Sequence, residues 1–300
     1  MKILLTLNKT YRGQIDVGYW YTYLPLQQMG HDVHLYDTAN PQERDYEKVI
    51  EAFKPDLIFC CMTGDRAITP SEPWERIAQE TRSGRTKTFN WFCDDTWRFE
   101  TFSSKACHYF NVCSTPEPSC LEKFKNIGYN NIILGPWHAS AELYSPRIFD
   151  ERDLKIAFVG APTPSRKRFF ENSDVPIEWV SGVSQEELFE TYNRSKIGLN
   201  LSKNDNDPTG KTQMKLRPFE IAAGGGLVLT QHHNGMEEFF EIDKEIITFS
   251  SQEEFDYKAT FLIENSHITK MIAAAGYKRF LAEHESKTRL SKILQQIKEF

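Results

Sequence analysis

The sequence predicts an α/β protein of two domains, each built on a parallel sheet with helices on both faces. Its 300 residues are about what two domains of roughly 150 residues require. In both halves, short apolar runs alternate with amphipathic segments, as expected for buried parallel strands joined by right-handed helical crossovers. The chain is 40% hydrophobic and 26% charged, which excludes a disordered protein.

The first half predicts one doubly wound sheet. Helices are predicted over 19–29, 45–53 and 117–125; the first ends at Gly30 and the second stops before Pro55, which cannot continue a helix. The apolar runs have the length of buried strands. They lie at 3–7, 33–36, 57–62, 88–93, 109–113 and 131–134.

The second half repeats the pattern and ends in helices. The alternation pauses after residues 135–138 and through Ser145-Pro146, and we place the domain boundary in this stretch, giving domains 1–145 and 146–300. Everything after Gln252 reads as helical, including 268–282 and 286–300, and we expect the last helix to pack back on the first domain. A ligand is expected in a cleft between the domains, beyond the carboxyl ends of the strands. The predicted strands are 154–160, 177–180, 197–201, 227–230 and 245–249.

Charge, cysteine usage and hydropathy narrow the class of protein. A net charge of −6 argues against a protein that coats a polyanion, although a local basic site remains compatible with it. The six cysteines lack the paired spacing of a zinc site, so they are expected to be reduced thiols. The first apolar run is too short for a signal peptide and no stretch approaches the roughly 20 residues of a membrane helix. These features predict a cytoplasmic protein with no membrane span.

The most informative segment reads KLRPFEIAAGGGLVLT over 215–230 and GMEEFF over 235–240. It predicts a helix with Glu220 on an apolar face, a glycine turn, a strand, and a second helix opened by Gly235. Backbone amides at that second helix could hold an anion. In the alternative interpretation Glu220 pairs with Arg217 or Lys215, and the glycines only make a tight turn.

This segment resembles the C-terminal signature of the CgeB-like (spore-maturation type) glycosyltransferases, relatives of glycosyltransferase family 4. There an Arg-x-Phe-Glu helix leads through Gly-Gly to a strand and then to Gly-x-x-Glu. KPDLIF at 54–59, WFCDD at 91–95, GPW at 135–137 and FVG at 158–160 agree with the family in order. The resemblance covers nearly the whole chain and is stronger after about residue 150. It implies the GT-B fold, two Rossmann-like domains facing across a cleft, with the acceptor domain first and the nucleotide-sugar donor domain second.

The resemblance also implies a set of donor-binding residues. Glu220 would bond the ribose hydroxyls of the nucleotide, a task that suits a carboxylate because it accepts two hydrogen bonds. Arg166 would neutralise the diphosphate, with Lys215 and Arg217 as further candidates. The alternative for residues 166–168 is a solvated basic helix face. Close backbone approach to the ligands is expected at four glycines, namely Gly160, Gly225, Gly235 and Gly13.

One position departs from the family pattern. Many family 4 enzymes carry a second glutamate eight residues before the first, where this chain has Thr212. Attention therefore moves to the polar loop 204–210, whose side chains could bond sugar hydroxyls. Asp205 and Asp207 match the Asp-x-Asp spelling by which a different glycosyltransferase fold binds metal. The GT-B fold normally works without one, so no metal is expected.

Asp94 and Asp95 are the candidates for acting on the acceptor. They follow the fourth predicted strand, and adjacent residues on a strand face opposite ways, so one of them is expected to reach the substrate. Either could orient or deprotonate an acceptor hydroxyl. The alternative for Asp95 is a helix N-cap.

We therefore expect a glycosyltransferase that moves a hexose or pentose from a nucleotide-diphosphate donor, expected to be UDP-linked, to an acceptor hydroxyl. Retention of configuration and no cofactor are implied by the resemblance. A non-catalytic nucleotide-sugar or glycan-binding protein is the alternative, and the acceptor could be a glycan, a protein or a hydroxymethylated DNA base. A nicotinamide-dependent oxidoreductase is least favoured because no Gly-x-Gly-x-x-Gly follows a predicted strand.

Overall fold

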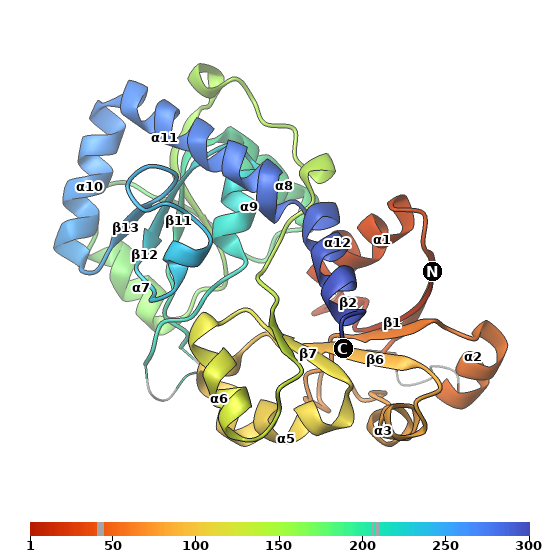
Figure 1. The fold of residues 1–300 in the computed structure, drawn as a ribbon. Helices are drawn as coiled ribbons and strands as arrows, with labels where there is room; N and C mark the ends of the chain where they lie inside the picture. The colour runs from red at the N-terminus through yellow and green to blue at the C-terminus, as the bar shows by residue number, and fades with distance from the viewer. Residues whose placement is uncertain (41–44, 206, 208–209) are drawn as a thin grey trace. The chain divides into compact units, whose positions relative to one another are not determined.

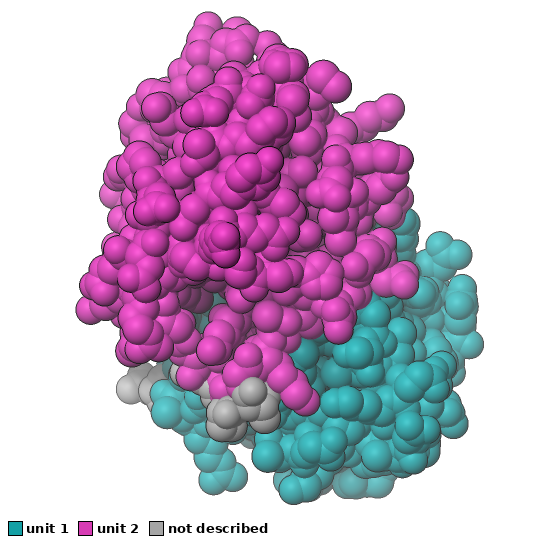
Figure 2. Space-filling model, turned by 90° about the vertical axis from the view of Figure 1, so that its left-hand side faces the viewer, with its two compact units in different colours: residues 1–136, 286–300 teal, residues 137–285 magenta. Residues whose placement is uncertain are grey.

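The computed structural model describes residues 1–40, 45–205, 207 and 210–300 (Figure 1). It divides into unit 1, residues 1–136 with 286–300, and unit 2, residues 137–285 (Figure 2). Each unit contains a parallel sheet with helices, so the predicted α/β fold with two sheets is confirmed. The units divide after Pro136, whereas sequence analysis placed the boundary after residue 145. In the described residues no helix has the length and apolar composition to cross a membrane.

Unit 1 is built on a six-stranded parallel sheet of order β4-β1-β5-β6-β7-β8. Strands are added on both sides of β1, which makes the sheet doubly wound and places loops for ligands at its carboxyl edge. The strands are β1 (Lys2–Leu7), β4 (Asp32–Asp37), β5 (Leu57–Cys60), β6 (Lys87–Trp91), β7 (Val112–Thr115) and β8 (Ile132–Leu134). A separate hairpin joins β2 (Thr10–Tyr11) to β3 (Gln14–Ile15).

The helices of unit 1 begin and end where local chemistry allows. Helix α2 (Tyr46–Phe53) starts at Asp45, whose carboxylate accepts from the amide of Glu47 at 3.0 Å, and it ends at Lys54 before a proline. Tyr109, predicted in a strand, belongs instead to a 3₁₀ turn, where its ring packs on Trp74. The other helical segments are η1 (Tyr19–Tyr23), α1 (Leu24–Gln28), α3 (Trp74–Ser83), α4 (Asp95–Arg98), η2 (Phe99–Ser103), α5 (Ser104–Ala106), η3 (Cys107–Tyr109), η4 (Pro118–Cys120), α6 (Leu121–Asn126) and α12 (Ser286–Ile297).

Helix α12 completes unit 1 from the far end of the chain. Its apolar stripe, Leu290, Ile293, Leu294 and Ile297, is buried, and the helix contacts α1 and η1. The spacing of these four residues places them on one helix face. The last helix thus packs with the first elements of the chain.

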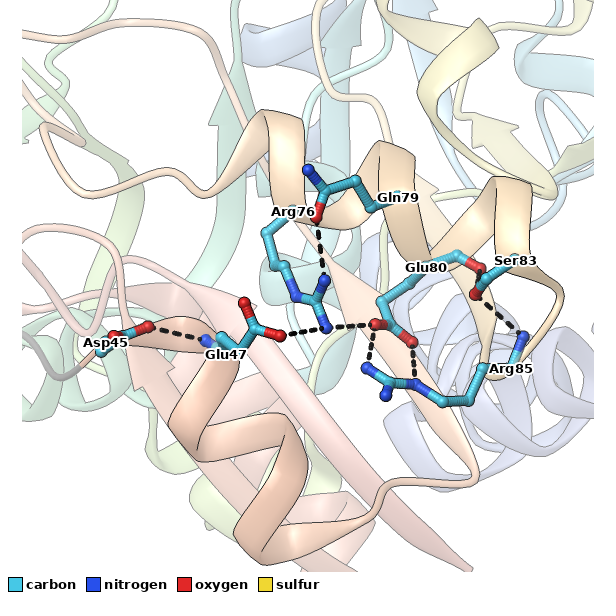
Figure 3. Close-up of polar contacts among 7 residues, drawn as sticks. All are labelled: Asp45, Glu47, Arg76, Gln79, Glu80, Ser83 and Arg85. Atoms are coloured by element: carbon cyan, nitrogen blue, oxygen red, sulfur yellow. Dashed lines mark hydrogen bonds and ion pairs between the residues drawn. The ribbon is translucent and has the colours of Figure 1, made fainter.

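A buried carboxylate fastens α3 to its surroundings in unit 1 (Figure 3). Glu80 is 1% exposed and accepts from Arg76 Nη2 at 2.8 Å and from Arg85 Nε at 3.0 Å. Arg76 also reaches Glu47 on α2, at 3.2 Å. Because the carboxylate has two cationic partners, its burial is compensated, and the network ties α2, α3 and the chain after α3 together.

Unit 2 is built on a five-stranded parallel sheet of order β10-β9-β11-β12-β13. Its strands are β9 (Leu154–Val159), β10 (Glu178–Val180), β11 (Ser195–Asn200), β12 (Leu227–Gln231) and β13 (Ile247–Phe249). The helical segments are η5 (Ala141–Leu143), η6 (Phe149–Glu151), α7 (Pro164–Glu171), α8 (Gln185–Arg194), α9 (Arg217–Ala223), η7 (Met236–Glu238), α10 (Gln252–Glu264), α11 (Ser266–Arg279) and η8 (Phe280–His284).

The amino edge of this sheet is held by Arg152, which is 4% exposed. Its guanidinium donates to the carbonyl oxygens of Ser195 at 2.7 Å and Gly224 at 2.7 Å, and so joins the start of β11 to the end of α9. Burial lowers the pKa of Arg152 to about 10, which still leaves it protonated at neutral pH. Arg152 is therefore a structural clamp at the edge opposite to the carboxyl ends of the strands.

We predict that Glu80→Gln lowers the free energy of unfolding by about 1.5–3 kcal/mol, the range for a hydrogen bond to a charged group. The neutral amide has one acceptor oxygen in place of two and no negative charge, so Arg76 loses its buried charge partner. Chemical denaturation should measure the change. Glu47→Gln is the matched control, because Glu47 is half exposed and its pair with Arg76 is worth about 1 kcal/mol or less. Equal effects of the two variants would contradict the assignment.

Candidate functional site

The candidate donor site lies in unit 2, where the carboxyl ends of β9, β11 and β12 bring polar groups to one edge of the sheet. Val159 ends β9, Asn200 ends β11, and Thr230 and Gln231 end β12. In parallel α/β sheets ligands bind at this edge. The side chains that meet here come from three separate segments of the chain.

Arg217, the first residue of α9, is anchored at this edge by two hydrogen bonds. Its Nε donates to the carbonyl of Val159 at 2.9 Å and its Nη1 donates to Asn200 Oδ1 at 2.9 Å. Asn200 is itself oriented, because its Nδ2 donates to Thr230 Oγ1 at 2.8 Å. The guanidinium lies over the Phe158 ring, 4.5 Å from the centroid. Arg217 is therefore held in one orientation.

Gly160 is required by the position of Arg217. A Cβ at residue 160 would lie 2.9 Å from Arg217 Nη2 and 2.9 Å from a carbon of the Phe158 ring. The carbonyl of Gly160 accepts from Trp179 Nε1 at 2.9 Å, which fixes the backbone. The glycine thus allows the guanidinium to approach the end of β9 closely.

Arg166 places a second cation beside Arg217. It lies on α7, where its Nη1 donates to the carbonyl of Ala161 at 2.9 Å and its guanidinium lies 5.3 Å from the Phe158 ring centroid. Burial lowers the pKa of Arg166 to about 10, and the like charge of Arg217 acts in the same direction. Among the described residues, neither arginine forms an ion pair with a carboxylate. Both guanidinium groups lie near the Phe158 ring and form a site suited to an anion.

Glu220 follows Arg217 by three residues on α9 and is 5% exposed. Burial raises the pKa of Tyr192, and the charge of Glu220 adds to that shift while Arg217 opposes it. The two α9 side chains and Tyr192 therefore act on one another. Lys215 is half-buried in the segment directly before α9. The structure thus brings together Arg166, Arg217 and Gly160, with Glu220 one helical turn away.

Two of the three glycines predicted in unit 2 do not join this group. Gly225 has a φ of +70° and lies before β12, at the amino edge, where a Cβ would meet Arg152 Nη2 at 2.9 Å. Its conformation serves the turn and the Arg152 clamp. Gly235 lies beyond the carboxyl end of β12, but its amide already donates to Glu237 Oε2 at 3.0 Å.

The helix predicted after Gly235 is a 3₁₀ turn of three residues. Just after this turn, the carbonyl of Phe239 accepts from His284 Nε2 at 2.7 Å and from Arg279 Nε at 3.0 Å. The rings of Phe240 and His284 pack with centroids 4.7 Å apart. A full helix N-terminus for an anion is thus absent at Gly235.

The loop around the Asp-x-Asp spelling is closed by a backbone bridge between Lys203 and Thr212. Asp205 accepts from the hydroxyl and, at 3.4 Å, from the amide of Ser165, so it caps the start of α7. Burial opposes the lowering of the Asp205 pKa, but these hydrogen bonds outweigh it. Asn206, Pro208 and Thr209, which belong to the predicted sugar-contact loop, lie outside the described residues. In the part of the chain that is described, no three His, Cys, Asp or Glu side chains gather as metal ligands.

The two neighbouring aspartates of unit 1 differ in how far they are exposed. Asp94 is half-buried at the N-cap position of α4, whereas Asp95 is 0% exposed. Burial raises the pKa of Asp95 to about 6, partly offset by the hydroxyls of Ser103 and Thr115. Of the two, only Asp94 has surface from which to meet an acceptor.

Gly13 lies with Arg12 in the two-residue turn of the β2–β3 hairpin, and both have positive φ. A two-residue hairpin turn of type I′ requires positive φ at both positions, which explains the glycine without a ligand.

Asn200 and Tyr192 were not predicted from the sequence as members of the site. Asn200 could have been found from the sequence, because it is a polar residue that ends an apolar strand at the ligand edge. Tyr192 could not, because its position on α8 looks like an ordinary core position until α9 is placed beside it.

The comparisons with known proteins identify a family and a fold. A family model described as glycosyl transferase-like matches residues 141–295, which include α7, α9 and the arginine pair. HepE of Anabaena in complex with UDP is similar in structure, with a TM-score of 0.67, 11% identity and 100% of both chains covered. Sucrose-phosphate synthase of Thermosynechococcus elongatus has a TM-score of 0.67 at 10% identity, covering 99% of this chain and 98% of that one. An alpha-glucosyltransferase in complex with UDP also has a TM-score of 0.67 at 10% identity, covering 99% and 100%.

These structures share the GT-B fold with this protein. No curated protein matches the chain by sequence. The family model covers more than half of the residues and contains every donor-site side chain described above. The chain therefore belongs to the glycosyl transferase-like family.

Proposed function

We propose that the protein is a retaining, metal-independent glycosyltransferase of the CgeB-like type, which moves a hexose or pentose from a UDP donor to an acceptor hydroxyl. The observation that carries the proposal is the pair of guanidinium groups on Phe158 at the carboxyl end of β9. Structural neighbours bound to UDP and UDP-glucose support the choice of donor.

The arginine pair suits a departing nucleoside diphosphate. Breaking the bond between the sugar and the diphosphate transfers negative charge to the phosphate oxygens, and fixed cations stabilise that charge. Arg217 uses Nε and Nη1 on Val159 and Asn200, which leaves Nη2, beside Gly160, to face a phosphate. With two cations in this position, a metal ion is not needed for the same task.

The remaining roles follow from burial and position. Glu220 would accept from the ribose hydroxyls of UDP. The donor's own phosphate would take the acceptor proton, which is compatible with retention and needs no protein nucleophile. Asp94, the half-buried member of the aspartate pair, would orient the acceptor hydroxyl.

Two alternative functions are each supported by one specific observation. Thr212 replaces the second glutamate of related enzymes, and its hydroxyl lies 3.0 Å from His233 Nδ1, so a protein that binds a nucleotide sugar without transfer is the first alternative. The second is a hydroxymethylated DNA base as acceptor. An alpha-glucosyltransferase structure with UDP and a 13-mer DNA containing an HMU base has a TM-score of 0.59 and 9% identity to this chain.

We predict that Arg166→Ala lowers kcat by about 100-fold or more, the loss seen when one preorganised charge-stabilising donor is removed. Binding of intact UDP-sugar should weaken less, because the interaction strengthens as the leaving group gains charge. Arg166→Lys should restore part of the rate. Steady-state transfer from UDP-glucose measures these effects.

Lys167→Ala and Arg168→Ala are the matched controls, because both residues lie on the exposed side of α7. Equal losses in all three variants would indicate a diffuse basic face and contradict the assignment.

Transfer should also persist in EDTA. A full loss of transfer that manganese restores would contradict metal independence and favour the aspartates of the 204–210 loop.

We predict that Glu220→Gln weakens UDP binding by about 1–3 kcal/mol while the fold stays intact. The amide can accept at one oxygen only, whereas the carboxylate can accept from both ribose hydroxyls. Calorimetric titration with UDP and with 2′-deoxy-UDP measures the effect. An unchanged dissociation constant for UDP would overturn the ribose assignment.

We predict that Asp95→Asn stabilises the protein relative to wild type by an amount that grows between about pH 4 and pH 6. The gain reaches roughly 3 kcal/mol at and above neutral pH. This value is the difference between the folded and unfolded pKa of Asp95, at about 1.4 kcal/mol for each pKa unit. The folded protein holds this proton more tightly than the unfolded chain, so the contribution of protonated Asp95 is complete below pH 4. It is lost as pH rises through the folded pKa of about 6. Denaturation curves at pH 4, 5, 6 and 7 measure it. A difference from wild type that does not change with pH would contradict burial of the carboxyl.

A further inference from the structure

Unit 1 contains a pocket whose residues do not belong to the proposed donor site in unit 2. A pocket of about 460 Å³ opens between the loop after β5 and the helical segments after β6. This volume is in the range of small-molecule sites. We call it the aromatic pocket; its principal lining residues are Arg66, Glu72, Trp74, Phe102, Lys105 and Tyr109.

The aromatic wall of this pocket is built from three rings. Trp74 packs edge to face with Phe102 at 5.8 Å and with Tyr109 at 5.5 Å between ring centroids. The indole is fixed because its Nε1 donates to Glu72 Oε2 at 2.9 Å. Fixed aromatic rings offer apolar surface to the C–H face of a sugar or to another flat group without a further ordering cost.

The loop that carries Glu72 is also held in place. Glu72 accepts from the amides of Thr63 at 2.6 Å and Gly64 at 2.9 Å, and the carbonyl of Thr63 accepts from Arg98 at 2.5 Å. Gly64 has a φ of +70°, and a Cβ there would lie 2.5 Å from the Phe102 ring. Because its oxygens accept these bonds and that of Trp74, Glu72 acts as a structural support of the pocket.

The polar groups that remain for a ligand are donors. Arg66 and Lys105 are exposed at the pocket, and neither side chain forms an ion pair or hydrogen bond with another described residue. The hydroxyl of Tyr109 likewise bonds no described residue. Two unpaired cations and a phenol beside aromatic rings match a ligand with both a ring and a negative charge.

We propose that the aromatic pocket binds a monosaccharide unit that carries a phosphate or a carboxylate, as a part of the acceptor. The choice of a saccharide rests on the proposed function. Arg66 and Lys105 bind the anionic substituent, and the ring lies against Trp74 and Tyr109. A nucleic acid is less suited, because it needs a row of cations, and the same segments carry Asp65, Glu75 and Glu100.

The test is calorimetric titration of the full chain with glucose 6-phosphate, glucuronate, glucose and inorganic phosphate. We expect the first two to bind, and glucose and phosphate to bind at least about 10-fold more weakly, because each offers only half of the contacts. Arg66→Ala and Lys105→Ala should each weaken glucose 6-phosphate by about 5-fold, as expected for solvent-accessible charge pairs. Equal affinity for glucose 6-phosphate and inorganic phosphate would overturn the saccharide assignment.

Arg82→Ala is the matched control, since Arg82 is an exposed arginine of the same unit, near the end of α3 and outside the pocket. It should leave glucose 6-phosphate binding unchanged. Thermal unfolding of each variant, together with UDP titration, checks that the fold and the donor site are intact.

Three further outcomes decide between explanations. Loss of glucose 6-phosphate binding in Arg166→Ala but not in Arg66→Ala would place the probe in the donor site and overturn the proposal. Binding of a hydroxymethylcytosine oligonucleotide that depends on Arg66 and Lys105, without saccharide binding, would also overturn it. Absence of UDP binding with Arg66-dependent glucose 6-phosphate binding would refute the proposed function while supporting the pocket.

Discussion

The hydrogen bonds of Arg217 to Val159 and Asn200 are the constraint on which the candidate donor site depends. They join the start of α9 to the ends of β9 and β11, three segments separated by long stretches of sequence. The need for glycine at 160, the orientation of Asn200 toward Thr230 and the stacking on Phe158 all follow from the place of this one guanidinium. Glu220 inherits its position from the same helix, three residues later.

The second arginine makes this arrangement costly in the absence of an anion. Arg166 is partly desolvated and lies near a like charge, and both effects lower its pKa. A pKa of about 10 still leaves it protonated at neutral pH, so the protein does not relieve the repulsion by losing a proton. A bound diphosphate would relieve it. Functional sites commonly retain such locally unfavourable arrangements because the rest of the fold stabilises them.

The sequence predicted the sheets well because the relevant signal is local. A buried parallel strand is a short apolar run, and runs such as 3–7 and 227–230 coincide with β1 and β12 to within about one residue. What depended on contacts between distant segments was not predicted. The alternation of strands and helices pauses from about Gly135 to Pro146, and the sequence does not show where in this stretch unit 1 ends. Nothing before Leu227 shows that Gly225 faces Arg152 instead of a ligand. Similarly, Asp94 and Asp95 are equivalent as letters, and only packing buries the second.

Hydrogen-bond partners, more than position, separate the acids that support structure from those available for chemistry. At the loops after the strands, Glu72 holds two backbone amides and an indole, Asp205 caps α7, and Glu237 occupies the amide of Gly235. Each of these carboxylates lies where a ligand-binding acid would be sought, and each already satisfies donors that would otherwise be left without an acceptor. The Asp-x-Asp spelling alone would select Asp205, whereas the Arg-x-Phe-Glu pattern selects Glu220. In the structure Asp205 stabilises a helix start, whereas Glu220 lies on the helix that the arginine anchor fixes at the ligand edge of the sheet.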